Sequence, residues 1–309
     1  MAEPEPFLRS DVAFLGEPVV GKVRDVYRHG EDLVIVTTDR LSGFDRVLGG
    51  VPHKGQVLNQ LSEWWFAQLE DVCASHLIAV PDPNVTVAVD CRPIPLELVV
   101  RGYLTGVTDT SIWTRYERGE RDFGGTTLPD GLAHNARLPT PLVTPTTKAP
   151  AGHHDENLDH DEVTGRGLLD AATWDRVREI ALGLFERGQD LAREGGLVLV
   201  DTKYELGVTP EGELVVIDEV HTPDSSRFWT TASLEAGEPE NLDKEVVRRW
   251  YAAQGYRGDG DPPPMAPELV ADMSRRYVSV YERLTGKAFE PAAQPAGPRI
   301  AAALRDWAS

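Results

Sequence analysis

The sequence LVLVDTKYELGV at residues 197–208, followed by LVVIDE at residues 214–219, is the part of the chain from which the fold can be reasoned outward. Both runs are rich in Val, Leu and Ile, and turn-forming Pro and Gly stand between them, so they predict a β-hairpin. Side chains two residues apart share one face of a strand. Asp201, Lys203 and Glu205 are therefore expected to project together, with apolar side chains on the other face.

The register of this hairpin determines which acidic side chains face one another. With the turn centred on residues 211–212, Glu205 is expected opposite Asp218, and a bulge at Gly212 would move the pairing by one residue. Like charges placed opposite each other destabilise a strand pair, so they need a neutralising partner. Lys203 is one candidate, and Mg²⁺ held together with substrate phosphates is another. The alternative is a solvated acidic face, because exposed carboxylates are well tolerated in water.

A second motif, GKVR at residues 21–24, lies within a strand-like run at residues 19–27. Together with residues 33–38 this run predicts an antiparallel hairpin. Lys22 and Arg24 would share one face beside a glycine, where the backbone approaches a ligand closely and two cations meet phosphates. The alternative is an ordinary exposed strand, because neither G-x-x-x-x-G-K-[ST] nor G-x-G-x-x-G is present.

The composition is that of a globular protein with an excess of acidic side chains. Of 309 residues 41% are hydrophobic, and 50 Asp and Glu oppose 31 Lys and Arg, which gives a formal net charge of -19. This sign disfavours nucleic acid and anionic membrane surfaces as partners. Two cysteines, no signal-like N-terminus and no apolar run of about 20 residues predict a cytoplasmic protein without disulfides or membrane spans.

Hydrophobic periodicity predicts the remaining elements. Helices are expected at residues 57–70, 172–194, 242–253 and 267–285, and further strands at residues 85–90 and 96–104. Residues 122–167 are rich in Gly, Pro, Thr, His and Asp and lack periodicity, so a long functional loop is expected there. The sequence leaves open whether the Ala/Pro-rich tail at residues 291–309 packs on the body or hangs free.

Six motifs follow one another between residues 21 and 229. They are GKVRDVY (21–27), DRLSGFD (39–45), VVRGYLTG (99–106), TPTTKA with HDEN (144–149 and 154–157), DTKYELG (201–207) and DEVHTPDSSRFW (218–229). In composition and order they resemble the SAICAR synthetase family, the phosphoribosylaminoimidazole-succinocarboxamide synthases. The resemblance implies a two-domain α+β fold, similar to ATP-grasp and kinase-like folds. A small N-terminal antiparallel β domain is expected at residues 1–95, and a larger α+β domain with C-terminal helices at residues 96–309.

The resemblance also implies a reaction. ATP, L-aspartate and carboxyaminoimidazole ribonucleotide (CAIR) would give the succinocarboxamide SAICAR, ADP and phosphate, through an acyl phosphate, in de novo purine (IMP) biosynthesis. ATP and Mg²⁺ are the expected cofactors, and the partners are small molecules, with the protein a monomer or a small homo-oligomer. An ATP-dependent small-molecule kinase and a non-catalytic nucleotide sensor are the alternatives. The kinase would share the glycine hairpin and the carboxylates but would need no aspartate site.

Individual residues receive roles from the same resemblance. The nucleotide phosphates are expected at Gly21, Lys22 and Arg24. Mg²⁺ is expected at Glu205 and Asp218, with Asp45 as a further acidic contact. The expected catalytic residues are Lys203, Asp155 and Arg227. The expected substrate-binding residues are Arg101, Ser111, Lys148, Asp155 and Arg227.

One departure from the family pattern concerns the contact with the CAIR phosphate. Family members commonly carry Gly-Ser after the VVRGYLTG-like strand, whereas four other residues, 107–110, follow Gly106 here. An insertion of four residues would give Ser111 the role of that serine. Thr108 and Thr110 are the alternatives.

Overall fold

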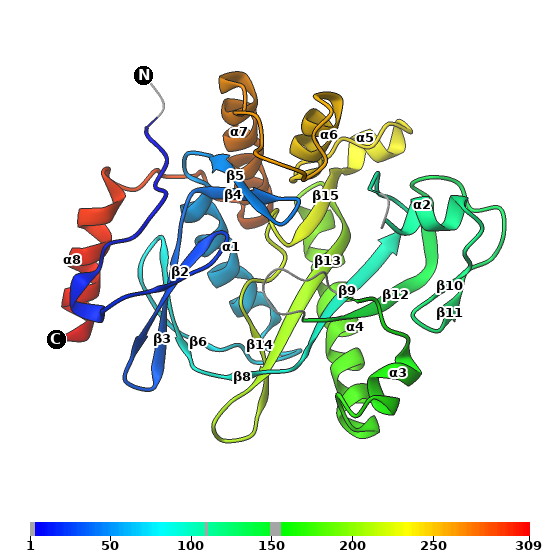
Figure 1. Ribbon diagram of the computed structural model, residues 1–309, viewed down its shortest axis with the longest axis horizontal. Helices are drawn as coiled ribbons and strands as arrows, with labels where there is room; N and C mark the ends of the chain where they lie inside the picture. The colour runs from blue at the N-terminus through cyan, green and yellow to red at the C-terminus, as the bar shows by residue number, and fades with distance from the viewer. Residues whose placement is uncertain (1–3, 109–110, 149–155) are drawn as a thin grey trace.

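The computed structural model describes residues 4–108, 111–148 and 156–309. They form two main antiparallel sheets, with helices packed around the larger one (Figure 1). The predicted α+β class is confirmed, whereas the domain boundary at residue 95 stays a prediction. Within these described ranges, no helix is long and apolar enough to cross a membrane.

The smaller sheet has five strands in the order β1-β2-β3-β7-β6. They are β1 (Val19–Val20), β2 (Arg24–His29), β3 (Asp32–Thr37), β7 (Val85–Val89) and β6 (Leu77–Asp82). The predicted hairpin is β2–β3, but residues 19–27 do not form a single strand. β1 and β2 pair around a tight turn in which the Gly21 N–H donates to the Arg24 carbonyl at 2.8 Å. Lys22 therefore lies in the turn, and the prediction that it shares a strand face with Arg24 is wrong.

The larger sheet is built around the long strand β13. Its order is β12-β9-β13-β14, and β15 and β8 also pair with β13. The strands are β12 (Arg137–Thr147), β9 (Leu96–Tyr103), β13 (Leu197–Val208), β14 (Leu214–Ile217), β15 (Ser226–Thr230) and β8 (Arg92–Pro93). Along β13 the side chains of Asp201, Lys203 and Glu205 are half-buried while Thr202 and Tyr204 between them are fully buried, as the alternation predicted.

The register of the β13–β14 hairpin differs by one residue from the predicted register. Glu205 pairs with Ile217, and not with Asp218. The Gly212 N–H donates to the Thr209 carbonyl at 2.9 Å, and Gly212 has a φ of 92°. A glycine adopts this conformation without steric penalty, and it produces the one-residue shift that the sequence left open as a bulge. Asp218 consequently lies just beyond β14, with a left-handed φ of 67°.

The helices occupy most of the predicted ranges. They are α1 (Lys54–Leu69), α2 (Ile112–Glu117), α3 (His160–Gly165), α4 (Ala171–Glu194), α5 (Thr231–Glu235), α6 (Glu245–Ala253), α7 (Pro267–Thr285) and α8 (Ala296–Ala308). The small elements are η1 (Ala13–Leu15), β4 (Arg40–Gly43), β5 (Arg46–Gly50), β10 (Asp122–Phe123) and β11 (Thr126–Thr127). α1, α4, α6 and α7 match predicted helices, because each carries an apolar stripe at helical spacing.

The expectation of a long loop at residues 122–167 is wrong, because this region contains the 11-residue strand β12. The strand was not predicted, because it contains three prolines, at positions 139, 141 and 145, and proline is uncommon in strands. β12 lies at one end of the sheet order and has β9 as its only neighbour on the path given above. The N–H groups on its outer edge therefore have no neighbouring strand of the sheet to donate to. Proline is tolerated at such an edge.

The main hydrophobic core lies between the larger sheet and helices α1, α4 and α7. From α4 it receives Trp174, Val177, Ala181 and Leu184, which recur every three or four residues and are all buried. Each large apolar side chain buried in this way contributes about 1.5–3 kcal/mol. This packing supports β13 from behind and leaves its charged side chains facing away from the core.

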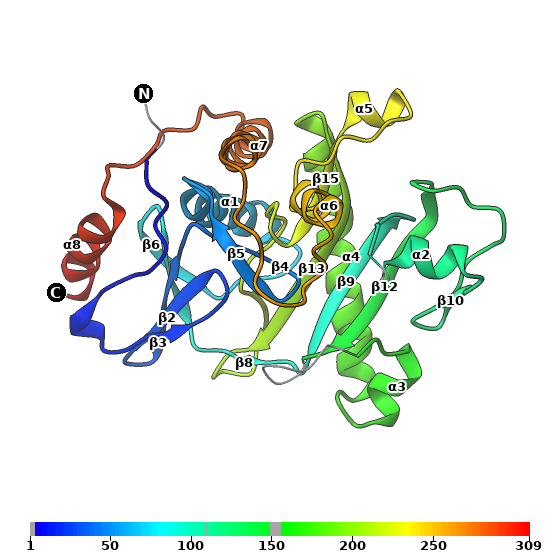
Figure 2. The ribbon, with the colours of Figure 1, turned by 45° about the horizontal axis from the view of Figure 1, so that its top comes forward.

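The C-terminal segment, whose attachment the sequence left open, packs on the body of the protein. α8 packs on the smaller sheet, at the end of the molecule opposite α2 and β10 (Figure 2). Ile300 and Leu304 are buried there against Val34 and Val36 of β3. The sequence contains no clear sign of this helix, because a run of Ala and Pro precedes its three large apolar side chains.

Replacing Leu304 by Ala should lower the free energy of unfolding by about 2–5 kcal/mol, because the side chain is fully buried and leaves a cavity. Urea unfolding followed by circular dichroism measures this. Asp306→Ala, on the exposed face of the same helix, should change the stability by less than about 0.5 kcal/mol. Equal, small effects of both substitutions would mean that α8 contributes nothing to the folded core.

Candidate active site

One cavity, the apolar cavity, lies between the smaller sheet and the β13–β14 hairpin. It has a volume of about 690 Å³. Its apolar wall is formed by side chains that include Val19, Val26, Ile35, Val89 and Ile217. Glu205, Asp218 and Lys148 also line it, so that charged groups and an apolar wall share one cavity. This combination suits a ligand with a flat apolar part and a charged end.

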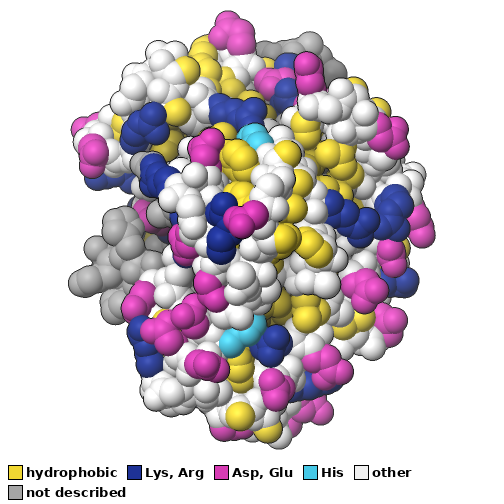
Figure 3. Space-filling view, turned by 90° about the vertical axis from the view of Figure 1, so that its right-hand side faces the viewer, with side chains coloured by type: hydrophobic (Ala, Val, Ile, Leu, Met, Phe, Trp, Pro, Cys, Tyr) yellow, Lys and Arg dark blue, Asp and Glu magenta, His cyan; other side chains and the backbone are white. Residues whose placement is uncertain are grey.

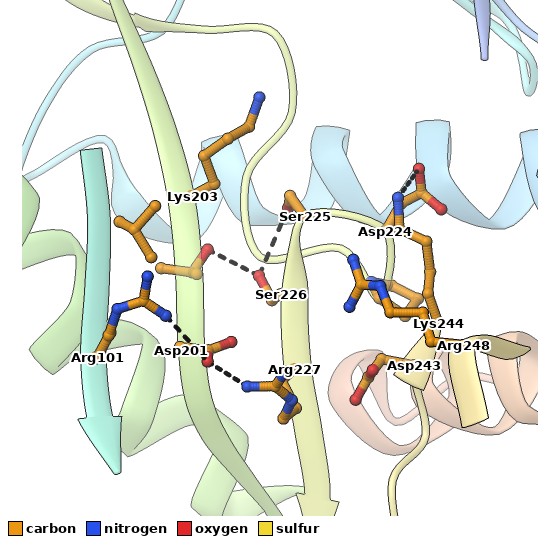
Figure 4. Close-up of a pocket in the computed structure, with 13 residues that line it drawn as sticks. Arg101, Asp201, Lys203, Asp224, Ser225, Ser226, Arg227, Asp243, Lys244 and Arg248 are labelled. Atoms are coloured by element: carbon orange, nitrogen blue, oxygen red, sulfur yellow. Dashed lines mark hydrogen bonds and ion pairs between the residues drawn. The ribbon is translucent and has the colours of Figure 1, made fainter. Parts of the chain in front are cut away.

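A second cavity, the charged cavity, has a volume of about 600 Å³. Six cationic side chains line it: Lys22, Arg101, Arg227, Lys244, Arg248 and Arg257. A smaller adjoining cavity of about 180 Å³ shares four of them and adds Lys203 and Asp224 (Figure 4). Clustered guanidinium groups bind carboxylates and phosphates, so these two cavities suit anionic ligands.

These cations stand out against the net charge of the protein. On the face shown in Figure 3, side chains of both signs are interspersed around a central band of hydrophobic ones. With a formal net charge of -19, the whole molecule does not attract anions. Attraction of an anionic ligand must therefore come from a local group such as the six cations of the charged cavity.

Strand β13 connects the cavities, because Lys203 lines the adjoining cavity and Glu205 lines the apolar cavity. The Lys203 ammonium lies 2.6 Å from Glu205 Oε1 and 3.0 Å from Glu97 Oε1. Lys148 forms a further ion pair with Glu205. Burial alone would raise the pKa of Glu205, but the two lysines outweigh it and lower the pKa to about 2. Glu205 is thus ionised at neutral pH.

Arg24 faces the carboxylates beyond β14. Its guanidinium lies 2.6 Å from Asp218 Oδ1 and 3.1 Å from Glu219 Oε2. Burial alone would lower the pKa of Arg24, but these carboxylates more than compensate and raise it. Lys22, by contrast, points from the β1–β2 turn to Asp45, with Nζ 2.7 Å from Oδ1, in an exposed pair. The structure thus separates Lys22 and Arg24, which the sequence placed together.

Asp45 also lies apart from the other two predicted metal ligands. It lines the charged cavity, whereas Glu205 and Asp218 line the apolar cavity. Among the residues that the structure describes, no group of three or more His, Cys, Asp and Glu side chains is placed to hold a metal ion. A role of these carboxylates in holding Mg²⁺ stays a prediction. Asp155 lies outside the described residues.

Arg101 and Arg227 meet at Asp201, as Figure 4 shows. Arg101 Nη1 lies 3.9 Å from Asp201 Oδ2, and Arg227 makes a closer pair with the same carboxylate. The buried Nε of Arg101 makes no hydrogen bond within the described structure. Burial lowers the pKa of Arg101, although the charge of Asp201 opposes the change. The two predicted arginines are therefore brought to one wall, with Asp201 holding them in place.

Ser111 lies in the same region, and its contact with the CAIR phosphate stays a prediction. It lines the charged cavity and is the N-cap of α2, where its Oγ accepts the Thr114 N–H at 3.3 Å. Gly106 has a φ of 115°, and a Cβ at this position would lie 2.5 Å from Ser111 Cβ. Glycine at position 106 is therefore required for Ser111 to reach the cavity. Thr108 lines the cavity as well, and Thr110 lies outside the described residues.

Sequence reasoning missed a buried charge cluster beside the adjoining cavity. Asp224 Oδ1 lies 3.2 Å from the ammonium of Lys54, which is fully buried, and Oδ2 lies 3.1 Å from that of Lys244. Burial alone would raise the pKa of Asp224, but the two lysines bring it well below its usual range. Tyr277 donates a hydrogen bond to Oδ1 at 3.1 Å. Asp224 lies in one of the six motifs, but Lys54 is 170 positions away, and no nearby residues indicated that it pairs with Asp224.

A second missed feature joins β13 to the loop that follows β14. The Tyr204 hydroxyl is hydrogen-bonded to Nε2 of His221, and both side chains are fully buried. His221 has a left-handed φ of 48° and packs edge-on against Trp65 at 4.6 Å. Burial lowers the pKa of His221 to about 3. The ring is therefore neutral in the folded protein at neutral pH.

This histidine should make the protein sensitive to mild acid. The pKa of His221 is about 3 when folded and about 6.5 when unfolded, so below pH 6.5 the unfolded chain binds a proton that the folded chain does not. Stability is therefore lost as the pH falls from 6.5 towards 3, by roughly 2–3 kcal/mol at pH 4.5. His221→Asn should remove this part of the pH dependence, since asparagine tolerates the left-handed backbone and does not titrate.

Urea unfolding at pH 6.5 and pH 4.5 measures the effect. Tyr204→Phe is the matched control, because it breaks the same hydrogen bond but keeps the titrating ring. It should retain the full difference between the two pH values. An unchanged difference in His221→Asn would show that His221 does not titrate between the folded and unfolded states as burial requires.

Known proteins resemble this chain over most of its length. The SAICAR synthetase family profile matches residues 18–263. A phosphoribosylaminoimidazole-succinocarboxamide synthase of Legionella pneumophila is 45% identical over 312 residues, covering 98% of this chain and 99% of the relative. The chloroplastic synthase of Arabidopsis thaliana is 44% identical over 304 residues, covering 96% of this chain and 74% of the relative.

Solved structures agree with the sequence relatives. The SAICAR synthase of Saccharomyces cerevisiae, complexed with SAICAR, has a TM-score of 0.80 and 31% identity, and the match covers 92% of this chain and 100% of that chain. A type-2 SAICAR synthetase in complex with ADP has a TM-score of 0.69 and 25% identity, covering 89% of this chain and 100% of that chain.

The fold and the family profile define an ATP-dependent ligase. The sequence relatives narrow this class further. The chain belongs to the SAICAR synthetase family, and its activity is ATP-dependent ligation in purine biosynthesis. The kinase alternative is not favoured, since every relative described above is a synthase of this family.

Proposed function

We propose that the apolar cavity takes ATP and that the charged cavity, with the adjoining one, takes CAIR and L-aspartate. The observation that carries this proposal is the placement of Lys203 and Glu205, two positions apart on β13, at the adjoining cavity and the apolar cavity respectively. The γ-phosphate of ATP and the carboxylate of CAIR would meet at this strand. The relatives solved with ADP and with SAICAR support small-molecule ligands of both kinds.

The chemistry requires the carboxylate of CAIR to be activated. One of its oxygens attacks the γ-phosphorus of ATP, the bond from that phosphorus to ADP breaks, and an acyl phosphate forms. The amine of L-aspartate then attacks the acyl carbon, the new C–N bond replaces the C–O bond to phosphate, and the amine loses a proton. Phosphoryl transfer depends mainly on positioning and charge neutralisation. Lys203, held between Glu97 and Glu205, supplies a fixed positive charge there.

Glu205 and Asp218 suit Mg²⁺ by the chemistry of their donor atoms. Both are carboxylates on the wall of the apolar cavity, and Mg²⁺ with nucleotide phosphates needs only one or two such ligands. When bound, the ion would neutralise negative charge on the phosphates. In the chain itself, Arg24 and the two lysines balance these carboxylates. Asp45, which faces Lys22 at the charged cavity, is proposed only as an acidic contact there.

The anionic substrates would be held by the arginine wall. Arg101 and Arg227 are aligned by Asp201 and present their guanidinium groups to both substrate cavities. We assign the CAIR phosphate to the region of Ser111, which lines the charged cavity.

Lys148 was expected at CAIR or aspartate, but it lines the apolar cavity and pairs with Glu205, so it would lie beside the phosphates of ATP. Asp155 is proposed to close over CAIR or aspartate and exclude water, which matters because an acyl phosphate hydrolyses.

The state of the thiols supports a proposal for the compartment. The two cysteines of the sequence, Cys73 and Cys91, are both buried and free. Free thiols suit a reducing environment, so we propose that the enzyme works in the cytoplasm.

Release of ADP tests the proposed function directly. The purified protein is given Mg-ATP and CAIR, with and without L-aspartate, and ADP and succinocarboxamide are measured together. We expect ADP release that depends on aspartate and equals the amount of SAICAR formed. Release that ignores aspartate would instead indicate a kinase. No release under either condition would contradict the proposal.

A further inference from the structure

The turn between β1 and β2 is held from behind by a buried arginine, Arg40, which has no part in the site as described so far. The Arg40 side chain is 8% exposed. Its Nη2 donates to the Gly21 carbonyl at 3.0 Å, and its Nε donates to the Lys22 carbonyl at 3.2 Å. The same guanidinium donates to the Leu8 carbonyl at 2.6 Å and to Asp25 Oδ1 at 2.8 Å. Four acceptors from three segments thus share one planar group.

A third carbonyl of the turn is held as well. The Val23 carbonyl accepts the Thr38 N–H at 3.0 Å and the Thr38 hydroxyl at 2.8 Å. Three successive carbonyls, those of residues 21–23, are therefore directed to buried donors. In a trans peptide the C=O and the next N–H point in opposite directions. The N–H groups of Lys22 and Val23 consequently face away from Arg40.

The outward side of this turn is suited to an anion. Successive backbone N–H groups in a turn form a concave site for phosphate oxygens, and the ammonium of Lys22 adds a charge beside them. β1 lines the apolar cavity through Val19, while Lys22 lines the charged cavity. The turn therefore lies where the phosphates of a nucleotide in the apolar cavity would extend towards the second substrate.

We propose that Arg40 is a positioning residue for nucleotide phosphates: it fixes the Gly21–Val23 turn so that the N–H groups of Lys22 and Val23 face the phosphate chain. This inference rests on the proposed function, which puts ATP in the apolar cavity. Arg40 does not touch the nucleotide. It acts through the carbonyls of the turn and through Asp25, the neighbour of Arg24 on β2.

Arginine is needed at this position because of the shape of its side chain. A guanidinium offers five donors in one plane, whereas an ammonium is a compact point charge that cannot reach four acceptors at once. Asp25 is fully buried, and its Oδ2 accepts both the N–H and the hydroxyl of Ser10 at 2.8 Å. The charge of Arg40 must therefore be kept, or a buried carboxylate loses its counter-ion. Arg40→Lys keeps the positive charge and removes the planar set of donors.

Binding of ATP and of adenosine to Arg40→Lys tests the inference, with the affinities measured by calorimetry. We expect the affinity for ATP to fall about tenfold, the loss that one or two hydrogen bonds explain, and the affinity for adenosine to change less than about twofold. A purely structural role would lower both affinities together, or only the melting temperature. Either of these results would overturn the proposal.

Two further variants keep the test decisive. Thr38→Val removes one hydrogen bond to the turn and should lower the affinity for ATP about threefold, even if Arg40→Lys does not fold. Arg299→Lys is the matched control in the same part of the protein, where the guanidinium pairs with Asp82 and bonds Asn84 at 2.9 Å. It should leave the ratio of the ATP and adenosine affinities unchanged. A changed ratio in this control would overturn the proposal.

Lys22→Ala separates this inference from the proposed function. It should weaken ATP binding if the turn meets the phosphates at all. Weaker binding in Lys22→Ala with normal binding in Arg40→Lys and Thr38→Val would overturn the role of Arg40 alone. Normal ATP binding in all three variants would overturn the placement of the phosphates at this turn, and the role of Arg40 with it.

Discussion

Replacing Asp218 by Asn should abolish turnover while leaving the fold intact. Asp218 has a left-handed φ of 67°, and asparagine is among the few residues other than glycine that adopt this conformation readily. The substitution keeps the size of the side chain and removes its charge. Arg24, 2.6 Å away, then loses a partner, and the site proposed for Mg²⁺ loses one of its two carboxylates. We expect kcat to fall at least about a hundredfold.

The measurement is kcat at saturating ATP, CAIR and aspartate, together with the thermal unfolding temperature. Glu211→Gln is the matched control, since Glu211 is an exposed acid in the turn of the same hairpin. It should have wild-type activity. A kcat close to that of the wild type in Asp218→Asn, at ordinary Mg²⁺ concentration, would contradict the assignment of Asp218 to the metal-bound nucleotide.

Replacing Arg227 by Lys should raise the KM for at least one of CAIR and aspartate by roughly 10–100-fold. The Arg227 side chain is only 12% exposed, and it pairs with Asp201 on one side and with Glu245 at 3.4 Å on the other. Lysine keeps the positive charge, so the fold should persist. It cannot contact both carboxylates and still present a planar pair of donors to a ligand. Loss of a charged, bidentate contact explains an effect of this size.

Saturation curves for CAIR and aspartate, each at a fixed excess of the other substrates, provide the test. Arg276→Lys serves as the control, because Arg276, on α7, also pairs with two acids, Asp272 and Glu240, and does not line the cavities. Its KM values should match those of the wild type. Unchanged curves in Arg227→Lys would show that this arginine holds Asp201 and Glu245 but no substrate.

Local pattern was sufficient for much of this architecture. The alternation along β13 placed Asp201, Lys203 and Glu205 on one face, and helical spacing located α4 and α7 to within a residue. Such features repeat every two or three to four residues, so each is encoded within a short window of sequence. The six ordered motifs then indicated the family, because together they span more than 200 residues.

Long-range packing decided the rest. The one-residue shift that puts Ile217 opposite Glu205 depends on the backbone of Gly212. β12 was not predicted because it contains prolines, which are tolerated in a strand at the edge of a sheet. α8 was not predicted, because its large apolar side chains pack against a sheet formed some 200 residues earlier in the chain.

The candidate site also combines features that local sequence predicts with features that depend on long-range packing. The residue types of its acids and cations could be read from the motifs, but their partners could not. Lys54 meets Asp224 across 170 positions, and Arg40 reaches back to Leu8 and Gly21 from a different strand. A charge is buried stably only where the folded chain brings its counter-charge and hydrogen-bond partners to it. Only the tertiary structure brings these partners together. Because they lie far apart in the chain, no periodic pattern in the sequence predicts the pairing.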